Sequence, residues 1–445
     1  MRVAYPKLTD RPGAIATASA VRRGECTPLQ SVERAIALIE QLDAHINAVV
    51  VTDFERARET AAAMGPTPGP DQPLFGVPMT VKESYDVAGL ATTFGHVRFK
   101  DNIAQRDSVV VRRLKAAGAI ILGKTNVPPD LADLQSDNPL YGRTNNPHDH
   151  ARSAGGSSGG GAAAVASGMV PCEYGSDTAS SIRNPAHFNG IWGHKTSFDL
   201  VSRRGHTHPA MAGRDVHGGP LSVVGPLARD ADDLALLLEV TADIAIPRRD
   251  KPLGEMRFLA VLNHPASEID AAVRTPIEAA LAELEKAGAT VDRASDRLPD
   301  LGRQHAGYMK LLNAAMGRGR PGPEGQSLAL ADWFGLLDAQ AANEYAWEAL
   351  FEHYDFVLAP PLAFLAFAHD ATPIPDRRIA INGRDRAFAD TLAWAGIASF
   401  PGLPSTVLPV GETGGMPCGM QVMGPRWGDF GCISAARAIG AVLHG

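Results

Sequence analysis

Two serine clusters stand 24 positions apart in the chain, and their residue types suggest nucleophilic chemistry. Ser157 and Ser158 lie in the run GGSSGG, whereas Ser180 and Ser181 lie in GSDTASSIRNP. A serine hydroxyl is a weak nucleophile until a base takes its proton, so these serines need a basic partner. Lys82 is the best candidate, because it follows the apolar segment FGVPMTV, where burial would favour the neutral amine.

The glycine-rich run has two other interpretations. Gly/Ser tracts of this composition are commonly flexible linkers. This run, however, leads into AAAVASGM, an expected helix whose first N–H groups would point at whatever binds there. Residues 155–159 also match the G-x-S-x-G nucleophile elbow, which requires a preceding strand. The residues before it, NNPHDHARS, are polar and turn-like, so the elbow is disfavoured.

The second serine cluster reads as a tight loop over Gly175 to Pro185. Successive backbone N–H groups in such a loop can stabilise the oxyanion of a tetrahedral intermediate. A Ser/Thr-rich turn is also commonly only a turn, whose side chains cap local backbone. The loop therefore becomes informative only together with the lysine and the glycine-rich run.

Helices and strands alternate along the chain and would position these residues. Thr27, Pro28 and Gln30 predict the capped start of an amphipathic helix. We expect strands over 75–81, 119–122, 258–262, 356–359 and 404–409, and helices over 108–117, 230–242, 268–287 and 388–395. This alternation predicts an α/β protein with an extended, at least partly parallel sheet. The Gly/Pro-rich stretch 316–326 is interpreted as a surface loop, which leaves residues 1–445 as a single domain.

Composition excludes several function classes. The 445 residues are 45% hydrophobic, enough for a large core, and carry a net charge of −7 without a basic patch, which argues against nucleic-acid binding. Four scattered cysteines predict reduced thiols, and no apolar run approaches a membrane span, so a cytoplasmic location is expected. The pair His206 and His208 has no carboxylate at ligand spacing, and we therefore expect neither a metal site nor a cofactor.

Taken together, these segments resemble the amidase signature family. The resemblance rests on GVPMTVKESYDVAGL at 76–90, GGSSGG at 155–160 and GSDTASSIRNPA at 175–186. Further family-like pieces are LGKTNVP at 122–128, DNPLYGRTNNP at 137–147, GLPSTVLPVG and GMPCGMQVMGP. The matches span most of the chain in order. They imply a single large domain with an extended mixed sheet surrounded by helices.

The resemblance also implies roles for individual residues. Ser181 would be the nucleophile, Ser157 a bridging serine with a cis peptide bond to its neighbour, and Lys82 the general base. Neutral Lys82 would draw a proton through Ser157 from Ser181, and an acyl-enzyme would follow. The remaining expected roles are the oxyanion hole (backbone N–H groups of Thr178, Ala179 and Ser180), supporting hydrogen bonds (Ser158 and Asp177), a structural ion pair (Arg183) and the pocket wall (Asn184 and His187).

One departure from the family pattern concerns the residues before the nucleophile. The usual glycine pair is replaced by Ala179 and Ser180, whose side chains must fit standard dihedrals or narrow the pocket. This puts substrate scope in doubt more than catalysis. Ser180 is itself an alternative nucleophile, but the following Ile-Arg context favours Ser181.

Three functions are compatible with these residues. The favoured one is an amidohydrolase that cleaves the C–N bond of a small carboxylic amide and releases acid and ammonia or amine. The second is the catalytic subunit of a tRNA-dependent glutamine amidotransferase. The third is an esterase or carbamate hydrolase of the same family. The expected partner is a small-molecule amide, and the resemblance adds a homodimer as the expected assembly.

Overall fold

The computed structural model describes residues 11–444 apart from 213, 215, 217, 249, 319 and 321–327. Within them, eleven strands form one sheet in the order β1-β3-β2-β6-β8-β7-β14-β15-β11-β9-β10. The strands are β1 (Val49–Thr52), β2 (Pro78–Lys82), β3 (Ile120–Thr125), β6 (Cys172–Asp177), β7 (Trp192–Lys195), β8 (Val223–Ala228), β9 (Arg257–Ala260), β10 (Thr290–Asp292), β11 (Phe356–Ala359), β14 (Ser405–Thr413) and β15 (Met416–Met423). Two small hairpins pair β4 (Asp137–Asn138) with β5 (Gly142–Arg143) and β12 (Arg378–Ile381) with β13 (Arg384–Ala387).

The large sheet is mixed. β2 runs parallel to both of its neighbours, β3 and β6, and β9 runs parallel to β10 and β11. The pairs β1–β3, β6–β8, β7–β8, β7–β14, β14–β15 and β11–β15 are antiparallel. The prediction of an extended mixed sheet is confirmed.

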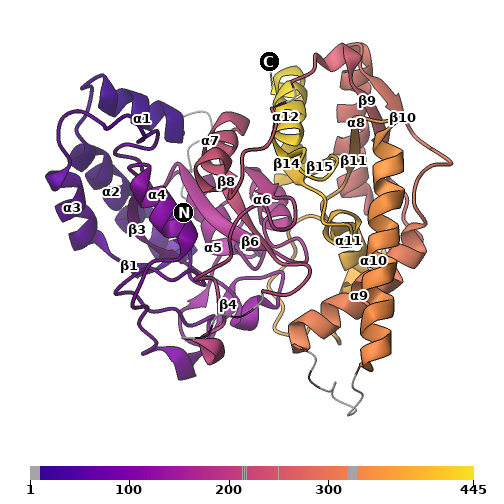
Figure 1. The fold of residues 1–445 in the computed structure, drawn as a ribbon, viewed down its shortest axis with the longest axis horizontal. Helices are drawn as coiled ribbons and strands as arrows, with labels where there is room; N and C mark the ends of the chain where they lie inside the picture. Colours follow the sequence, from indigo (N-terminus) through magenta and orange to yellow (C-terminus); the bar gives the residue numbers. More distant parts are fainter. Residues whose placement is uncertain are drawn as a thin grey trace.

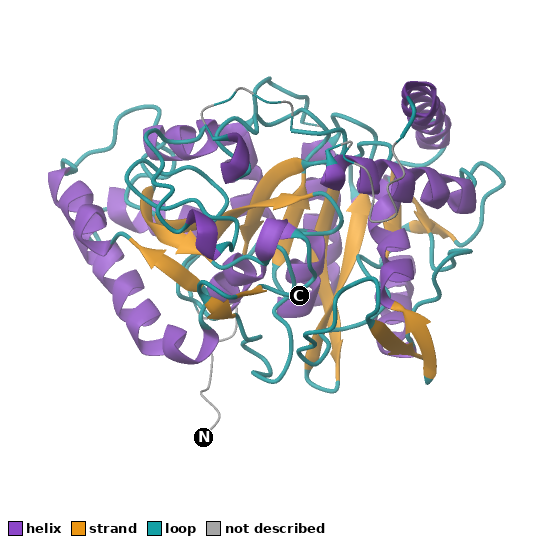
Figure 2. Cartoon of the chain, turned by 90° about the horizontal axis from the view of Figure 1, so that it is seen from below, coloured by secondary structure: helices purple, strands orange, loops and turns teal. Residues whose placement is uncertain are grey.

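Helices flank this sheet (Figure 2). They are α1 (Ala14–Arg22), α2 (Pro28–Ile46), α3 (Phe54–Ala63), α4 (Val109–Ala116), α5 (Gly159–Ala166), α6 (Arg183–Asn189), α7 (Ala231–Thr241), α8 (Ala271–Lys286), α9 (Leu301–Gly317), α10 (Leu330–Phe351), α11 (Ala393–Ser399) and α12 (Asp429–His444). Figure 1 shows α1 to α4 at one end of the molecule, α8 to α11 at the other, and α12 between them. Figure 1 places α5 and β6 between these two groups of helices.

Most of the predicted elements are present. α2 begins with the predicted capping box, in which the Thr27 side chain accepts the Gln30 N–H and the Gln30 side chain accepts the Thr27 N–H. The predicted strand at 356–359 matches β11, and the helix predicted at 108–117 matches α4 within one residue at each end. The apolar segment before Lys82 forms β2, which ends at that lysine.

Two predictions need correction, and a third is not tested. The loop predicted over 175–185 is shorter, because residues 175–177 belong to β6 and residues 183–189 form α6. The helix predicted at 388–395 starts as a 3₁₀ turn over Phe388–Leu392 and continues as α11. Residues 319 and 321–326 of the predicted surface loop lie outside the described residues.

The glycine-rich run is packed backbone and not a linker. A Cβ on Gly160 would lie 2.3 Å from the backbone nitrogen of Asn126, and one on Gly156 would lie 2.4 Å from the carbonyl oxygen of Asp133. Such approaches exclude any side chain, which explains the glycines. Residues 145–158, all described, contain only isolated bridges before α5 begins, so the strand that a nucleophile elbow needs is missing there.

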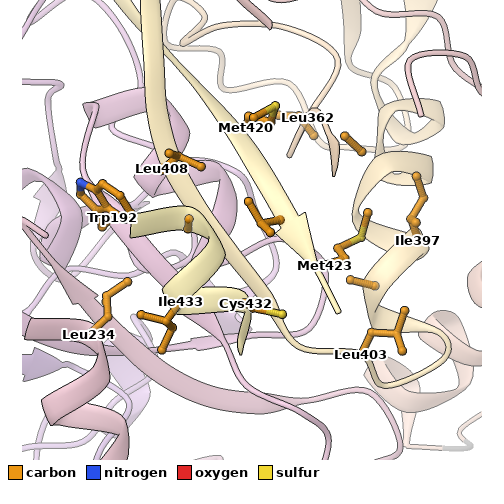
Figure 3. Close-up of a cluster of buried hydrophobic side chains, with 14 of the residues drawn as sticks. Trp192, Leu234, Leu362, Ile397, Leu403, Leu408, Met420, Met423, Cys432 and Ile433 are labelled. Atoms are coloured by element: carbon orange, nitrogen blue, oxygen red, sulfur yellow. The ribbon is translucent and has the colours of Figure 1, made fainter. Parts of the chain in front are cut away.

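The hydrophobic core consists of side chains from the sheet and from the helices that pack against it. Figure 3 shows one part of it, where Leu408 of β14 and Met420 and Met423 of β15 gather with Cys432 and Ile433 of α12. All four cysteines are free and buried, which confirms the expected thiols. No helix in the described part of the chain has the length and apolar character that a membrane crossing requires.

Candidate active site

Lys82 is fully buried at the end of β2, and its amine points at serine hydroxyls. Lys82 Nζ donates to Ser157 Oγ at 2.6 Å and to Ser176 Oγ at 2.9 Å. β2 lies between β3 and β6, and its neighbour β6 carries Ser176. The predicted contact between Lys82 and Ser157, 75 positions apart in the chain, is therefore present.

The buried environment of Lys82 favours its neutral amine. Burial lowers the pKa of Lys82 to about 7, although the negative charges of Asp177 and Glu173 act to raise it. A lysine with a pKa near neutrality holds a useful fraction of free amine at physiological pH. The expectation that desolvation would favour the neutral amine agrees with this environment.

The glycine-rich run places two serines against β6. The peptide bond between Gly156 and Ser157 is cis, at the residue for which the family resemblance implied one. Ser158 donates its backbone N–H to the carbonyl oxygen of Ser181 at 3.2 Å, and its hydroxyl donates to the carbonyl oxygen of Ser176 at 3.3 Å. Ser158 thus links the two serine clusters, and its supporting role in catalysis stays a prediction.

Ser180 and Ser181 differ in what their hydroxyls can do. The Ser180 side chain is fully buried, and its hydroxyl donates to the carbonyl oxygen of Pro361 at 3.3 Å. Ser181 is 7% exposed, and its hydroxyl makes no hydrogen bond to any residue that the structure describes. Of the two candidate nucleophiles, Ser181 is therefore the one whose hydroxyl is not held by a hydrogen bond to a described residue.

Asp177 and Arg183 form a buried ion pair that shapes the loop between β6 and α6. Arg183 Nε and Nη2 each lie 3.0 Å from an oxygen of Asp177, and both side chains are fully buried. Burial acts to raise the pKa of Asp177, but the charge and hydrogen bonds of Arg183 outweigh it and leave the pKa below its ordinary value. The carboxylate also accepts the backbone N–H of Ile182 at 3.0 Å. The ion pair expected of Arg183 is thus present, while the supporting role of Asp177 stays a prediction.

The three predicted oxyanion donors are not equivalent. Ser180 donates its N–H to Asp177 Oδ1 at 2.9 Å, so this donor is already paired. The N–H of Ala179 makes no hydrogen bond to a described residue. Ser180 also has a positive φ of 77°, the left-handed conformation that glycine adopts most easily, whereas Ala179 does not. Of the two residues that replace the usual glycine pair, Ala179 therefore has a standard backbone conformation and Ser180 a strained one.

Asn184 joins the two serine-bearing segments. Its side-chain amide donates to the carbonyl oxygens of Gly156 and of Ser180, and its side-chain oxygen accepts the Gly156 N–H at 3.2 Å. His187, in contrast, accepts the Gly419 N–H on Nδ1 at 2.7 Å, while its Nε2 lies 3.1 Å from the carbonyl oxygen of Phe364. Both ring nitrogens are thus occupied in the core, and His187 is a packing residue.

Sequence reasoning missed two residues of this site. Ser176 is a second hydroxyl partner of Lys82, and its place in the loop motif beside Asp177 could have signalled it. Glu173 is fully buried on β6 and accepts hydrogen bonds from the hydroxyls of Thr80 and Thr125. Burial raises the pKa of Glu173 to about 8, while the hydroxyl contacts and Lys82 act to lower it. No sequence pattern signalled it.

A surface cleft of about 460 Å³ lies elsewhere, between α1 and α7. Asp233 in its lining accepts the backbone N–H groups of Ala14 and Ile15 at 2.6 and 2.8 Å and so caps the start of α1. The cleft contains none of the predicted site residues.

Comparison with known proteins identifies relatives along nearly the whole chain. The family model described as Amidase matches residues 30–318 and 334–433. The chain is 31% identical to the indoleacetamide hydrolase of Bradyrhizobium diazoefficiens, over 96% of this chain and 85% of that protein. It is 30% identical to a subunit of the glutamyl-tRNA(Gln) amidotransferase of Lacticaseibacillus casei, over 95% of each chain.

A solved structure is similar to the fold over the same extent. It is a bacterial aryl acylamidase of the amidase signature family, with a TM-score of 0.79 and 26% identity over 97% of this chain and 96% of that one. The mixed sheet with flanking helices predicted from the sequence is thus confirmed by a related fold as well as by the structure itself.

Proposed function

The chain belongs to the amidase signature family and is an amide-hydrolysing enzyme, and on that premise we propose that Lys82, Ser157 and Ser181 perform the hydrolysis. In this proposal Ser181 is the nucleophile, Ser157 relays protons and Lys82 is the general base. The products are a carboxylic acid and ammonia or an amine. No step requires a cofactor.

One observation carries the proposal. The Lys82 amine is buried and hydrogen-bonded to Ser157 at 2.6 Å, while the Ser157–Ser158 backbone abuts Ser181. A hydroxyl both donates and accepts hydrogen bonds, so Ser157 can pass a proton on where a carbonyl could not. The hydroxyls of Ser157 and Ser181, both among the described residues, are not hydrogen-bonded to each other. The proposal requires that this contact tighten when substrate binds, as catalytic hydrogen bonds often do.

The proposed reaction balances in two halves. Ser181 attacks the amide carbonyl as its proton passes through Ser157 to Lys82, and the resulting oxyanion is held by backbone N–H groups, with Thr178 and Ala179 as proposed donors. The same route then returns the proton to the leaving nitrogen, so the C–N bond breaks and an acyl-enzyme remains. Water attacks the ester as its proton passes through Ser157 to Lys82, and the same route then returns that proton to the Ser181 oxygen as the acid leaves.

A mutational test separates the proposed nucleophile from its neighbour. Amine or ammonia release would be measured over a panel of aliphatic and aryl amides, with esters and carbamates alongside, for wild type, Ser181→Ala and Ser180→Ala. We expect Ser181→Ala to lose about 10⁴-fold or more in kcat and Ser180→Ala to stay within about tenfold of wild type, the loss expected from one hydrogen bond. Mass spectrometry of the quenched enzyme should find the acyl group on Ser181. Loss of activity in Ser180→Ala with retention in Ser181→Ala would refute the assignment.

A second candidate function follows from the relative in Lacticaseibacillus casei. Its similarity over 95% of both chains favours a catalytic subunit that releases ammonia from glutamine. The discriminating measurement is glutaminase activity with and without purified partner subunits of such an amidotransferase. Activity that appears only with the partners would favour this candidate over a free-standing hydrolase of small amides.

A further inference from the structure

Three potential metal ligands from distant parts of the chain meet outside the lysine and serine site. His96 Nε2 lies 2.7 Å from Asp130 Oδ1, and His208 Nε2 lies 2.9 Å from the same oxygen. The three ligand atoms all lie within 4.8 Å of one another. Both imidazole Nε2 atoms contact the same carboxylate oxygen, so the two nitrogens and this oxygen form a compact triangle. Sequence spacing could not indicate it, since Asp130 precedes His208 by 78 positions.

Short 3₁₀ turns hold all three residues. His96 precedes the turn Val97–Phe99, Asp130 lies within the turn Pro129–Leu131, and His208 precedes the turn Pro209–Met211. Asp130 has a positive φ of 56°, and its N–H donates to the carbonyl oxygen of Phe94 at 3.1 Å. Aspartate tolerates this backbone better than most residues. The carboxylate is thus directed by fixed backbone.

Two phenylalanines fix the imidazole planes. Phe99 packs edge-on against His96 and His208, with ring centroids 6.0 and 5.5 Å apart, and Phe94 packs against His208 at 5.1 Å. The side chains of His96, Asp130 and His208 are 23, 51 and 26% exposed, so an ion can reach them from solvent. An apolar surround with an open side is typical of metal sites that keep free coordination positions.

We propose that His96, Asp130 and His208 bind a divalent first-row transition-metal ion of the Zn²⁺ class. Two imidazoles and one carboxylate are ligands that such ions accept. Bonds of about 2.1 Å at tetrahedral angles would place neighbouring donors about 3.4 Å apart. The observed separations of 2.7 and 2.9 Å are hydrogen-bond lengths, so the three side chains would move apart by about half an ångström to admit the ion. The remaining positions would hold water or another ligand.

Binding requires a defined change of tautomer at His208. His208 Nδ1 accepts the backbone N–H of Ala210 at 3.2 Å, so the ring proton is on Nε2 and is donated to Asp130. Coordination through Nε2 requires the proton on Nδ1 instead. The Ala210 contact would then be lost, but this residue is exposed and water can replace it. The ring proton of His208 moves from Nε2 to Nδ1, so the ring carries one N–H proton both before and after the ion binds.

The bound ion would connect three loops, and one of them reaches the lysine and serine site. His206 lies two residues before His208, and its Nε2 lies 2.9 Å from Ser84 Oγ, two residues beyond Lys82. His206 also packs against Tyr85, with ring centroids 4.8 Å apart. An ion bound to His96, Asp130 and His208 would thus hold the segment from His206 to His208 against Ser84 and Tyr85.

The test uses the full-length chain after treatment with a chelator. Isothermal titration with Zn²⁺, with Mg²⁺ as the hard-cation control, would be compared for wild type, His96→Ala, His208→Ala and Asp130→Asn. We expect one Zn²⁺ per chain in wild type, loss of that site in both alanine variants, and at least about tenfold weaker binding in Asp130→Asn. Asparagine also accepts the left-handed backbone, so this variant removes charge with little change of fold.

Two further measurements make the outcome decisive. His45→Ala removes an exposed histidine elsewhere and should leave the titration unchanged. Nitrogen-15 NMR of the His208 ring should show the proton on Nε2 without Zn²⁺ and on Nδ1 with it. No Zn²⁺ binding in wild type, equal binding in all variants, or a proton that stays on Nε2 at saturating Zn²⁺ would each overturn the proposal.

Discussion

Two of the three fully buried lysines in the described part of the chain, Lys82 and Lys195, have similar environments and different partners. Burial lowers the pKa of each to about 7. Lys82 donates to the hydroxyls of Ser157 and Ser176, whereas Lys195 donates to the carbonyl oxygens of Thr196 and Leu403 at 3.2 and 2.8 Å. A depressed pKa therefore does not by itself distinguish a base from a structural amine.

The difference between the two lysines lies in the atoms that their amines contact. A carbonyl oxygen only accepts hydrogen bonds, so the amine of Lys195 has no route by which to take a proton from a nucleophile. A serine hydroxyl also donates, so Lys82 can receive a proton through Ser157. The partner, more than the pKa, assigns the chemistry, and variants of both lysines can test this.

Replacing each lysine by methionine tests the comparison most directly and has the largest expected effect. Methionine fills a similar volume without the amine. Lys82→Met should lower kcat/KM for an amide by about 10³-fold, because the proposed general base is lost. Lys195→Met should stay within about tenfold of wild type, because its amine donates to backbone carbonyls and each such hydrogen bond is worth little more than about 1 kcal/mol. Circular dichroism would confirm that both variants fold, and equal losses of activity would show that burial alone matters.

The pH dependence of wild-type activity is the next largest effect. Only the neutral amine of Lys82 accepts a proton, and its pKa is lowered to about 7. The value of kcat/KM should therefore fall about tenfold per pH unit below about pH 7 and level off above it. A profile measured between about pH 5 and 9 on an amide whose own groups do not titrate would check this.

Variants of Glu173 and Lys195 show whether that acid limb belongs to Lys82. Burial raises the pKa of Glu173 to about 8, so this acid is largely uncharged over the limb below pH 7. Glu173→Gln keeps both the shape and the neutral state of the side chain, so the midpoint of the limb should hardly move. Lys195→Met should also leave the midpoint in place, because the amine of Lys195 contacts backbone carbonyls. An acid limb that is lost in Lys195→Met would reverse the assignment.

The sequence predicted one part of this comparison well. Lys82 could be placed at a buried strand end because seven apolar or small residues precede it, and the family-like motifs then supplied Ser157 and Ser181. β6 could not be predicted, because its sequence CEYGSD is polar and its Glu173 is satisfied by threonines on two other strands. Such partners are brought together only by the sheet order.

Lys195 and the group of His96, Asp130 and His208 show the same limit of sequence-based prediction. Lys195 receives its backbone partner at Leu403 from a segment 208 positions away, across the pairing of β7 with β14. No local pattern distinguishes that lysine from a solvated one. Residue types and short spacings thus indicated the chemistry of one site, while contacts between distant segments determine which other polar groups are buried or assembled.

A smaller effect is expected from the second hydroxyl partner of Lys82. Ser176→Ala removes the 2.9 Å hydrogen bond that helps hold the amine toward Ser157. We expect kcat to fall about tenfold, the value of one hydrogen bond, with KM unchanged because substrate binding is not altered. Ser176→Thr keeps a hydroxyl and should restore most of the rate. A change in KM alone would place Ser176 at the substrate instead.

The smallest effect concerns the backbone of the loop that carries Ser180, and it should alter stability more than chemistry. Ser180 has a φ of 77°, and its hydroxyl donates to Pro361. Ser180→Ala keeps the strain and loses the hydrogen bond, so the free energy of unfolding should fall by about 1 kcal/mol. Ser180→Gly loses the same bond but relieves a strain of about 1–2 kcal/mol, partly offset by the entropy of glycine. Urea unfolding should therefore find the glycine variant more stable than the alanine variant, and the opposite order would show that the φ of Ser180 costs nothing.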